Sequence, residues 1–498
     1  MHSGARAAMV AALLAAVALV ALVLAADRPR GAGRLQSDRE LDREARAILE
    51  ELVSINTVEP RGSTEAALAM AARFRAAGFP DEDIHLVGPV QHKQNLVVRL
   101  RGTAPEAKPL LLLAHLDVVE ARREDWSSDP FTLVEKDGYL YGRGTTDMKD
   151  MAACWVVTLL DMKRRGIRPL RDVVLALTAD EEGGGANGVD WLVRTRRELI
   201  EAAFCLTEGG GGQIHDGRYT VYNLQAAEKV YLTFRLEATD TGGHSALPRR
   251  GNPIVRLAAA LGRLDSFQFP ARLNEVTRSF FARMAEVEGG SAGLDMRRLA
   301  EAPPPDVGPS SPPLAVSRSV PAADAAGAER RLSRQPYFNA LLRTTCTATR
   351  IEGGHAENAL PQRATAWVNC RLLPDDSADQ VEQALVEAIR DAEVRVTRMG
   401  QPSPGPAAPL LPEVVQAVEG AVAERWPHVI VVPTMLTGAT DGRILRLAGI
   451  PTYGLGAFED VSDSRAHGRD ERIGIRQFRE ERALLAAIVT RLSGAPSR

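Results

Sequence analysis

The sequence predicts an α/β fold in which helices flank a mixed, mostly parallel sheet. Three short apolar runs, rich in β-formers and without alternation, end in polar residues: 95–100, 110–114 and 173–178. Continuous apolar strands of this kind are typical of a sheet that is buried on both faces. Helical patterns alternate with these strands at residues 38–55, 66–77 and 148–164. Because domains average about 150 residues, the length of 498 residues predicts more than one domain.

The N-terminal segment, residues 1–33, differs from the globular remainder. Residues 7–26 are 20 consecutive apolar positions, a length on the border between a signal-peptide core and a membrane-spanning helix. A retained anchor and a cleaved signal both fit this pattern, and residues 27–36 would form a polar linker. In either case we expect an extracytoplasmic protein, membrane-anchored or secreted, whose only membrane contact is through this segment.

Charge excludes one class of partner, and cysteine content leaves the redox state open. The net charge of −3 and the pI near 6.4 give no support for a nucleic-acid partner, which would need a clustered basic surface. Disulfides are permitted in an exported protein, but two of the four cysteines lie in apolar runs. We therefore favour four buried thiols at Cys154, Cys205, Cys346 and Cys370.

A second, α+β domain is predicted to be inserted within the first. At residues 230–238 the pattern changes to alternation, as in a strand with one wet face, and alternation returns at 364–372. Residues 302–326 are rich in Pro, Ala and Ser and predict a long loop. The predicted boundaries are 34–227 and 402–498 for the two parts of the first domain and 228–401 for the insertion.

Acidic and imidazole side chains follow the predicted strands. His115 and Asp117 follow the second apolar run, Glu181 and Glu182 follow the third, and Glu208 ends a further one. Ligand sites gather at the carboxyl ends of strands in such sheets, so these side chains are expected to share one site. Imidazole and carboxylate together suit zinc, and a carboxylate two residues from a histidine can also orient its ring.

The adjacent acids Glu181 and Glu182 are the most telling of these residues. Two neighbouring carboxylates repel each other unless a positive group offsets them. A solvated turn is one interpretation of the pair. The other is that one Glu binds a metal ion while its neighbour takes the proton of a water molecule that the metal activates.

Asp147 and His467 complete the set of candidate ligands. Asp147 follows two glycines and precedes a helical pattern, so it fits a helix N-cap, yet its two oxygens also suit a bridge between two cations. His467 lies among charged residues in a loop-like stretch. A surface histidine is the alternative there to a metal ligand.

Together these pieces resemble the M20 family of metallopeptidases. The resemblance covers about residues 40–490 and rests on motifs that come in the family's order: His115-Leu-Asp117, Gly142-Arg-Gly-Thr-Thr-Asp147-Met-Lys149, Asp180-Glu-Glu-Gly-Gly-Gly-Ala-Asn-Gly188, Glu208-Gly-Gly, Gly243-His244-Ser-Ala-Leu-Pro248, Asn358-Ala-Leu-Pro361 and His467. It implies a zinc-peptidase catalytic domain with an inserted lid or dimerisation domain.

The resemblance also implies a role for each residue of the cluster. Two Zn²⁺ ions would be bound by five ligands: His115, Asp147, Glu182, Glu208 and His467. Asp147 would bridge both ions, Asp117 would hold the ring of His115, and Glu181 would be the general base. Mixed nitrogen and oxygen ligation suits zinc, although Co²⁺ or Mn²⁺ can substitute in such sites.

Further motifs concern the substrate. Asn358 and Arg371 match the pair with which family carboxypeptidases hold a free carboxylate, and the planar fork of Arg suits that task. His244 would stabilise the oxyanion from the lid, in many relatives from a partner subunit, which implies a homodimer through the lid domain. Gly438 and Thr440 match a glycine-rich loop that lines the pocket.

One branch of the family is the most similar. The stretch from Asn339 to Cys346, the Pro-rich insertion and the N-terminal segment look most like carboxypeptidase S and the N-acyl-amino-acid hydrolases. Thr207 is a departure, because many of those relatives have Asp before the glutamate; we take Glu208 as the ligand.

The expected activity is hydrolysis of an amide or peptide bond next to a free carboxylate, in a small peptide or an N-acyl amino acid. An aminopeptidase of a related two-metal type would need an acidic anchor in place of Arg371. A non-catalytic binding protein is disfavoured because every expected ligand and the general base are present.

Overall fold

The structure is a computed structural model that describes residues 30–183, 185–302, 323–402 and 404–496. The predicted signal or anchor at residues 7–26 lies outside them. Among the helices of the described ranges, none combines the length and the apolar character needed to cross a membrane.

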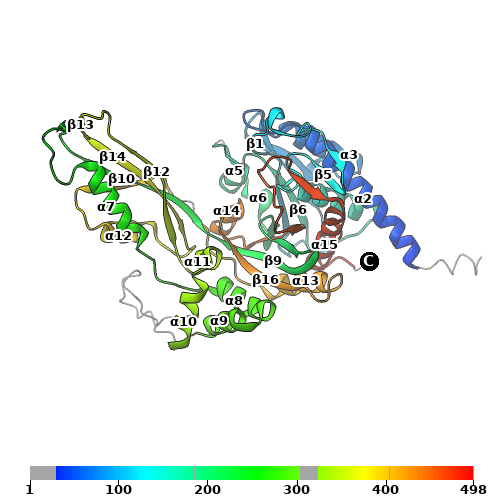
Figure 1. Cartoon of the computed structure of the whole chain (residues 1–498). Coiled ribbons are helices and arrows are strands. Elements are labelled where there is room, and N and C mark those ends of the chain that lie inside the picture. The colour runs from blue at the N-terminus through cyan, green and yellow to red at the C-terminus, as the bar shows by residue number, and fades with distance from the viewer. Residues whose placement is uncertain (1–29, 184, 303–322, 403, 497–498) are drawn as a thin grey trace, which may run out of the picture.

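A sheet of 10 strands forms the centre of the larger part of the molecule (Figure 1). Its order is β1 (Ile84–Val90), β2 (Lys93–Leu100), β6 (Val173–Thr178), β3 (Leu110–His115), β7 (Phe204–Thr207), β17 (Thr452–Gly454), β9 (Arg218–Glu228), β8 (Gly211–His215) and β18 (Phe458–Asp460), with β16 (Ile430–Leu436) also paired to β9. The three central strands β6, β3 and β7 are parallel, whereas β1 and β2 are antiparallel. The predicted mixed, mostly parallel sheet is confirmed.

Helices cover both faces of this sheet because its central strands are apolar on both sides. Leu110 and Leu112 of β3 belong to the core shared with one group of helices: α2 (Arg30–Ser54), α3 (Thr64–Ala76), α4 (Lys149–Arg164), α13 (Pro412–Ala423) and α15 (Ile475–Ser493). Leu111 and Leu113 of the same strand face a second core formed with α5 (Gly188–Thr195), α6 (Arg197–Ile200) and α14 (Gly442–Leu447). Alternate residues of a strand point to opposite faces, so one apolar run supplies both cores.

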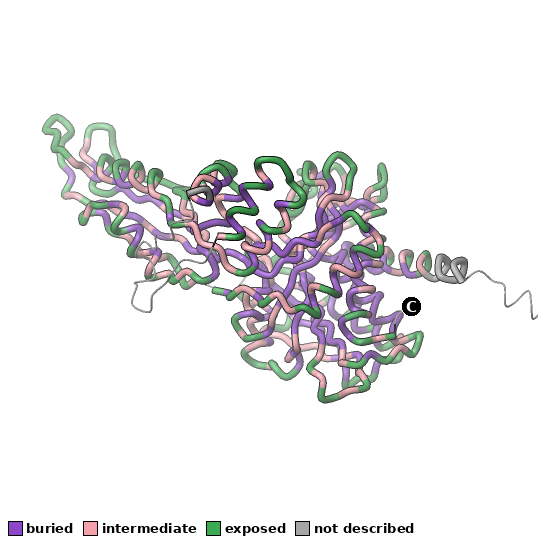
Figure 2. Tube along the Cα trace, turned by 90° about the horizontal axis from the view of Figure 1, so that it is seen from below, coloured by how far each residue is buried: buried purple, intermediate pink, exposed green. Residues whose placement is uncertain are grey.

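The second domain is a four-stranded sheet with helices on one face. Its order is β12 (Thr345–Gly353), β14 (Arg363–Leu372), β10 (Val230–Thr239) and β15 (Val394–Met399), covered by α7 (Pro253–Asp265) and α12 (Ala378–Ile389). Alternate residues of β10 are buried, as the sequence pattern predicted. Its far end carries a short pair, β11 (Gly243–His244) and β13 (Ala359–Leu360), and is mostly exposed (Figure 2). It corresponds to the domain that the sequence predicted as a lid, and we call it the lid below.

Four helices that lie between lid strands in the sequence belong to the main core instead. They are α8 (Glu275–Glu288), α9 (Gly290–Glu301), α10 (Ala323–Leu332) and α11 (Pro336–Leu342). Phe281 of α8 and Leu341 of α11 are fully buried there. A last small sheet, β19 (Arg472–Gly474), β5 (Tyr139–Tyr141) and β4 (Val134–Lys136), lies against α15.

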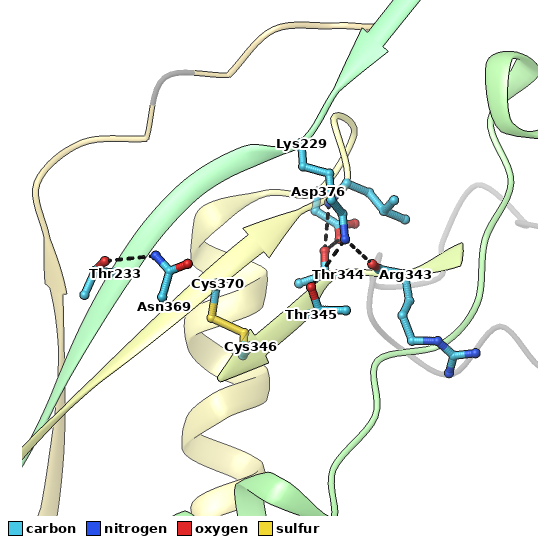
Figure 3. The surroundings of a disulfide bond; sticks show 10 residues. Lys229, Thr233, Arg343, Thr344, Thr345, Cys346, Asn369, Cys370 and Asp376 are labelled. Carbon is cyan, nitrogen blue, oxygen red and sulfur yellow. Dashed lines mark hydrogen bonds between the residues drawn. A yellow bond between two sulfur atoms is a disulfide. The ribbon is translucent and has the colours of Figure 1, made fainter. Parts of the chain in front are cut away.

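Three expectations from the sequence are wrong. Residues 30–36 are not a linker but the first turns of α2, and residues 323–326 begin α10 rather than end a loop. The expectation of four buried thiols is also wrong, because Cys346 of β12 and Cys370 of β14 form a disulfide (Figure 3). The two cysteines are directly opposite each other in the strand register, with Cα atoms 4.1 Å apart. Cys154 and Cys205 are free and buried, as expected.

Candidate metal centre

The cluster begins where the three central strands end. His115 is the last residue of β3, Glu208 directly follows β7, and Glu181 and Glu182 follow β6 after two further residues. Because β6, β3 and β7 are parallel neighbours, their carboxyl ends lie at the same edge of the sheet. The fold thus brings these four side chains to one place.

Two more residues reach this edge from outside the sheet. Asp147 precedes α4 and is joined to Met148 by a cis peptide bond. His467 lies in the loop between β18 and β19, in the left-handed conformation with φ 63°, and its side chain is 52% exposed. The cluster is therefore open to solvent on the side of His467 and closed on the side of His115, which is buried.

Asp147 lies between the two histidines. Its Oδ1 is 3.0 Å from Nε2 of His115, and its Oδ2 is 2.9 Å from Nε2 of His467. Glu208 Oε1 lies 3.6 Å from the first imidazole, and Glu182 Oε1 lies 2.9 Å from the second. The side chains form two half-sites, each with one imidazole, one terminal carboxylate and one oxygen of Asp147.

This donor set fits two divalent cations. Two ligand atoms of a tetrahedral zinc ion, each about 2.0–2.1 Å from the metal, are about 3.3 Å apart, close to the separations found here. Ligand atoms of His115, Asp147 and Glu182 lie within 4.8 Å of one another, as do those of His115, Glu181 and Glu208. Mixed imidazole and carboxylate ligation is that of zinc sites and of related divalent metals.

The electrostatics of the cluster show an excess of negative charge. Burial and the nearby carboxylates raise the pKa of Glu208 well above its usual value, and burial with Asp441 raises the pKa of Glu181 to about 8. Hydrogen bonds to Asp147 and Glu182 raise the pKa of His467 to about 10. Burial opposes ionisation of Asp147, but its hydrogen bonds with both histidines outweigh burial and lower its pKa. Such crowded acids call for bound cations.

Asp117 holds the backbone of the glutamate pair. Its two carboxylate oxygens accept hydrogen bonds from the backbone N–H groups of Glu181 and Glu182, at 3.1 and 3.0 Å. Nδ1 of His115 lies 3.0 Å from the backbone carbonyl oxygen of Asp117 and 3.7 Å from its carboxylate. Asp117 therefore contacts the imidazole mainly through its main chain.

The family model for peptidase family M20/M25/M40 matches residues 111–491, which include the whole cluster. The chain belongs to this family. Among curated proteins, it is 27% identical over 461 residues to the probable carboxypeptidase S-like 2 of Dictyostelium discoideum, covering 89% of this chain and 83% of that protein. It is 28% identical over 480 residues to the N-fatty-acyl-amino acid synthase/hydrolase PM20D1 of Mus musculus, covering 91% and 89%.

A solved structure shares the fold of this M20 protein. The M20 family metallo-carboxypeptidase Sso-CP2 from Sulfolobus solfataricus superposes with a TM-score of 0.63 at 18% identity, covering 91% of this chain and 99% of that one. The membership and these relatives identify the protein as an enzyme, an M20 metallopeptidase or amidohydrolase. The recognition made from the motifs is confirmed.

Arg371 lies where the lid of this M20 enzyme meets the catalytic domain. Its Nη1 is 3.5 Å from the carbonyl oxygen of Thr437, in the loop between β16 and α14. Gly438 and Thr440 are in the same loop, and the hydroxyl of Thr440 donates to Glu228 at 3.1 Å. The guanidinium of Arg371 also stacks on Tyr231, 4.8 Å from the ring centre.

His244 and Asn358 lie far from Arg371 within one chain. The strands β11 and β13 bring them together, and Ser245 donates a backbone hydrogen bond to the carbonyl of Asn358 at 3.0 Å. Both are exposed, and β13, which directly follows Asn358, lies at the far end of the lid (Figure 1). Arg371 is near the opposite end of β14, roughly 26 Å along the strand from Arg363 at about 3.3 Å per residue. The predicted carboxylate-binding pair is not assembled in a single chain.

Sequence reasoning missed two supporting residues, Glu471 and Asp441. The carboxylate of Glu471 accepts from the backbone N–H of Thr146 at 2.9 Å and from Arg143 at 2.6 Å, which fixes the residue before Asp147. Asp441 is buried near Glu181 and accepts from Asn187 at 2.6 Å. Asp441 directly follows Thr440 and Glu471 lies four residues after His467, so their closeness to residues singled out in the sequence was the available signal.

Proposed function

We propose that this protein is a dinuclear zinc hydrolase that cleaves an amide or peptide bond next to a free carboxylate. The observation that carries the proposal is the position of Asp147, whose two oxygens each approach a different histidine. A carboxylate held in this way suits a bridge between two cations. His115 and Glu208 would complete one site, and His467 and Glu182 the other.

The chemistry divides between the cations and the side chains. Two bound divalent cations would polarise the scissile carbonyl and make a shared water molecule acidic. Co²⁺ or Mn²⁺ would serve in place of zinc because the ligands are nitrogen and oxygen. The protein supplies fixed ligand positions, which Asp117 and Glu471 support through backbone hydrogen bonds.

Glu181 would act as the general base. It lies beside the cluster without being needed for either half-site, and its carboxylate is within 4.8 Å of ligand atoms of His115 and Glu208. In this position it can take a proton from the attacking water and deliver it to the leaving amine. Asp117 would keep Glu181 in place by holding its backbone N–H.

Substrate binding would combine residues of both domains. Arg371, at the junction, offers a two-pronged donor for a carboxylate, and the loop with Gly438 and Thr440 forms the adjacent wall. His244 and Asn358 would come from the lid of a second copy, because their own lid end lies far from their own cluster. Substrates would be small peptides or N-acyl amino acids, in keeping with the names of the curated relatives.

The proposed location is outside the cytoplasm. The Cys346–Cys370 disulfide favours an oxidising compartment, where such bonds persist. The apolar run at residues 7–26 supplies a signal or an anchor in this proposal. An aminopeptidase is the second candidate, but Arg371 at the junction would repel a substrate amine.

The substitution Glu181→Gln tests the mechanism. Removing the general base should lower kcat by about 10²–10⁴-fold, while metal analysis still finds both ions because no half-site needs Glu181. Glu198→Gln, at a side chain that is 64% exposed and pairs with Arg196, is the matched control and should not alter kcat. Wild-type turnover in the Glu181 variant would remove this residue from the mechanism.

A pair of substrates tests the carboxylate. Hydrolysis of an N-acyl amino acid should be faster than that of its C-terminal amide. Arg371→Met should lower kcat/KM for the acid by about 10–100-fold and leave kcat/KM for the amide unchanged. Arg363→Met, on the same strand at a 69% exposed side chain, is the control. Equal rates for acid and amide, or a preference for a free substrate amine, would favour the aminopeptidase.

A further inference from the structure

Lys93 is a buried lysine next to the cluster, at the first position of β2. Its side chain is 4% exposed, and its Nζ lies 2.7 Å from Asp180 Oδ1 and 2.6 Å from Glu59 Oε2. Burial by itself would lower the pKa of Lys93, but the two carboxylates raise it, so the ammonium group stays charged. This buried cation is costly to remove, because the buried carboxylate of Asp180 would lose its charged partner.

Asp180 is the residue that turns the chain from β6 to the glutamate pair. Its φ is 63°, a left-handed conformation that residues other than glycine rarely adopt. Oδ1 accepts from Lys93, and Oδ2 accepts from the backbone N–H of Ala186 at 2.6 Å. The turn therefore depends on a carboxylate that is itself anchored to β2.

Other residues hold the backbone of the loop that follows β6, whereas Lys93 binds a side chain of this loop. Asn95 accepts from the backbone N–H of Ala179 at 3.0 Å, and Asp117 accepts from those of Glu181 and Glu182. Asn95 fixes the loop before the turn, and Asp117 fixes it from the side of the cluster. At the turn itself, Asn187 Nδ2 donates to the backbone carbonyl of Asp180 at 3.3 Å, and Lys93 holds the Asp180 side chain.

We propose that Lys93 is a positioning residue that sets the placement of Glu181 through Asp180. Without the ammonium group the buried Asp180 carboxylate loses its cation and the turn relaxes, so Glu181 shifts relative to the reacting atoms. A misplacement of about 1 Å can cost about 100-fold in rate. The inference rests on the proposed role of Glu181 as the general base.

A competing role for Lys93 is direct binding of substrate. Lys93 lines a cavity of about 450 Å³ beside the cluster, together with Asp117, Asp180 and Glu182. A substrate-binding lysine would act mainly on KM, whereas a positioning residue acts mainly on kcat. The split between the two constants separates these roles.

The test is steady-state kinetics of Lys93→Met with metal analysis of the same sample. We expect kcat to fall about 100-fold, KM to stay within about threefold and both ions to remain bound. Lys93→Arg, which keeps the charge, should recover a large part of kcat. Lys108→Met is the matched control, because Lys108 is 65% exposed and pairs only with Glu201 among the described residues, and it should behave as wild type.

Glu59→Gln provides a second route if Lys93→Met does not fold. Glu59 is 52% exposed, so its loss spares the core, yet it removes one of the two anchors of the ammonium group. A fall in kcat of a few-fold at constant KM supports the proposal. Unchanged kcat in both Glu59→Gln and the folded Lys93 variants, a change in KM alone, or recovery of kcat by added metal overturns it. Wild-type turnover in Glu181→Gln would instead remove the proposed general base, on which this inference rests.

Discussion

The two histidines of the cluster predict how metal binding depends on pH. In the metal-free protein the pKa of His467 is about 10 and that of His115 is well above its usual value, because both lie against carboxylates. His467 is therefore protonated near neutral pH when no metal is bound, and a histidine must lose its proton to bind a metal. Metal affinity should therefore fall as the pH is lowered from 8 to 6, by about tenfold per pH unit for each proton released.

Competition titrations with Zn²⁺ at several pH values measure this dependence. His467→Ala should remove one ion and the release of one proton, whereas His215→Ala, at an exposed ring that is not part of the cluster, should leave the titration unchanged. An affinity that does not vary with pH would contradict the protonated state of the metal-free cluster.

At the level of residues, the sequence identified the members of the cluster better than the residues that hold them in place. His115, Glu182 and Glu208 stand out because acids and imidazoles after apolar strands are unusual, whereas Asp147 and His467 were assigned through the resemblance to the M20 family. The fold brings all five together. The role of Asp117 is harder to predict, since a backbone hydrogen bond to its carboxylate leaves no pattern in the sequence. Lys93 is likewise separated from Asp180 by 87 positions.

The disulfide is a feature of two paired strands, and it predicts a thiol count. Unfolded in guanidinium without reductant, the chain should expose two reactive thiols, from Cys154 and Cys205, and four after reduction. Replacing Cys346 and Cys370 by serine should lower the free energy of unfolding by about 3 kcal/mol, given the 24-residue separation. This double variant should show two thiols with or without reductant. Four thiols in the unreduced wild type would contradict the pairing.

At the level of elements, the apolar pattern predicted the strands that are buried by packing, but not the contacts that depend on which strands pair. The run 173–178 is β6 in full, and the alternation at 230–238 is β10. The start of α2 was missed because Gly31 and Gly33 disfavour a helix, while propensity is a weak guide to a long helix. Cys346 and Cys370 face each other only through the register of β12 and β14, which cysteine spacing does not reveal.

At the level of the whole molecule, the presence of the inserted lid could be predicted, but not which helices belong to it or how far its sheet extends. The change from continuous to alternating apolar strands marks the passage from one sheet to the other at Lys229. The return of α8–α11 to the main core leaves no such mark, because helices of either domain share one pattern. The separation of His244 from the cluster likewise depends on the length of the lid sheet, at whose far end β11 pairs with β13 (Figure 1).

This separation leads to a prediction about subunits. If His244 serves the cluster of a second copy, a dimer of Glu181→Gln and His244→Ala chains has one intact site, formed by Glu181 of one chain and His244 of the other. If His244 served its own chain, that dimer would have none. Mixing the two inactive variants under conditions that exchange subunits should therefore restore activity, to about a quarter of the wild-type rate when chains pair at random. Glu181→Gln mixed with His115→Ala is the control: both lesions lie in the catalytic domain, so neither site of the mixed dimer is intact. A mixture of the first pair that stays inactive, although mass measurement shows mixed dimers, would mean that the lid folds back onto its own catalytic domain.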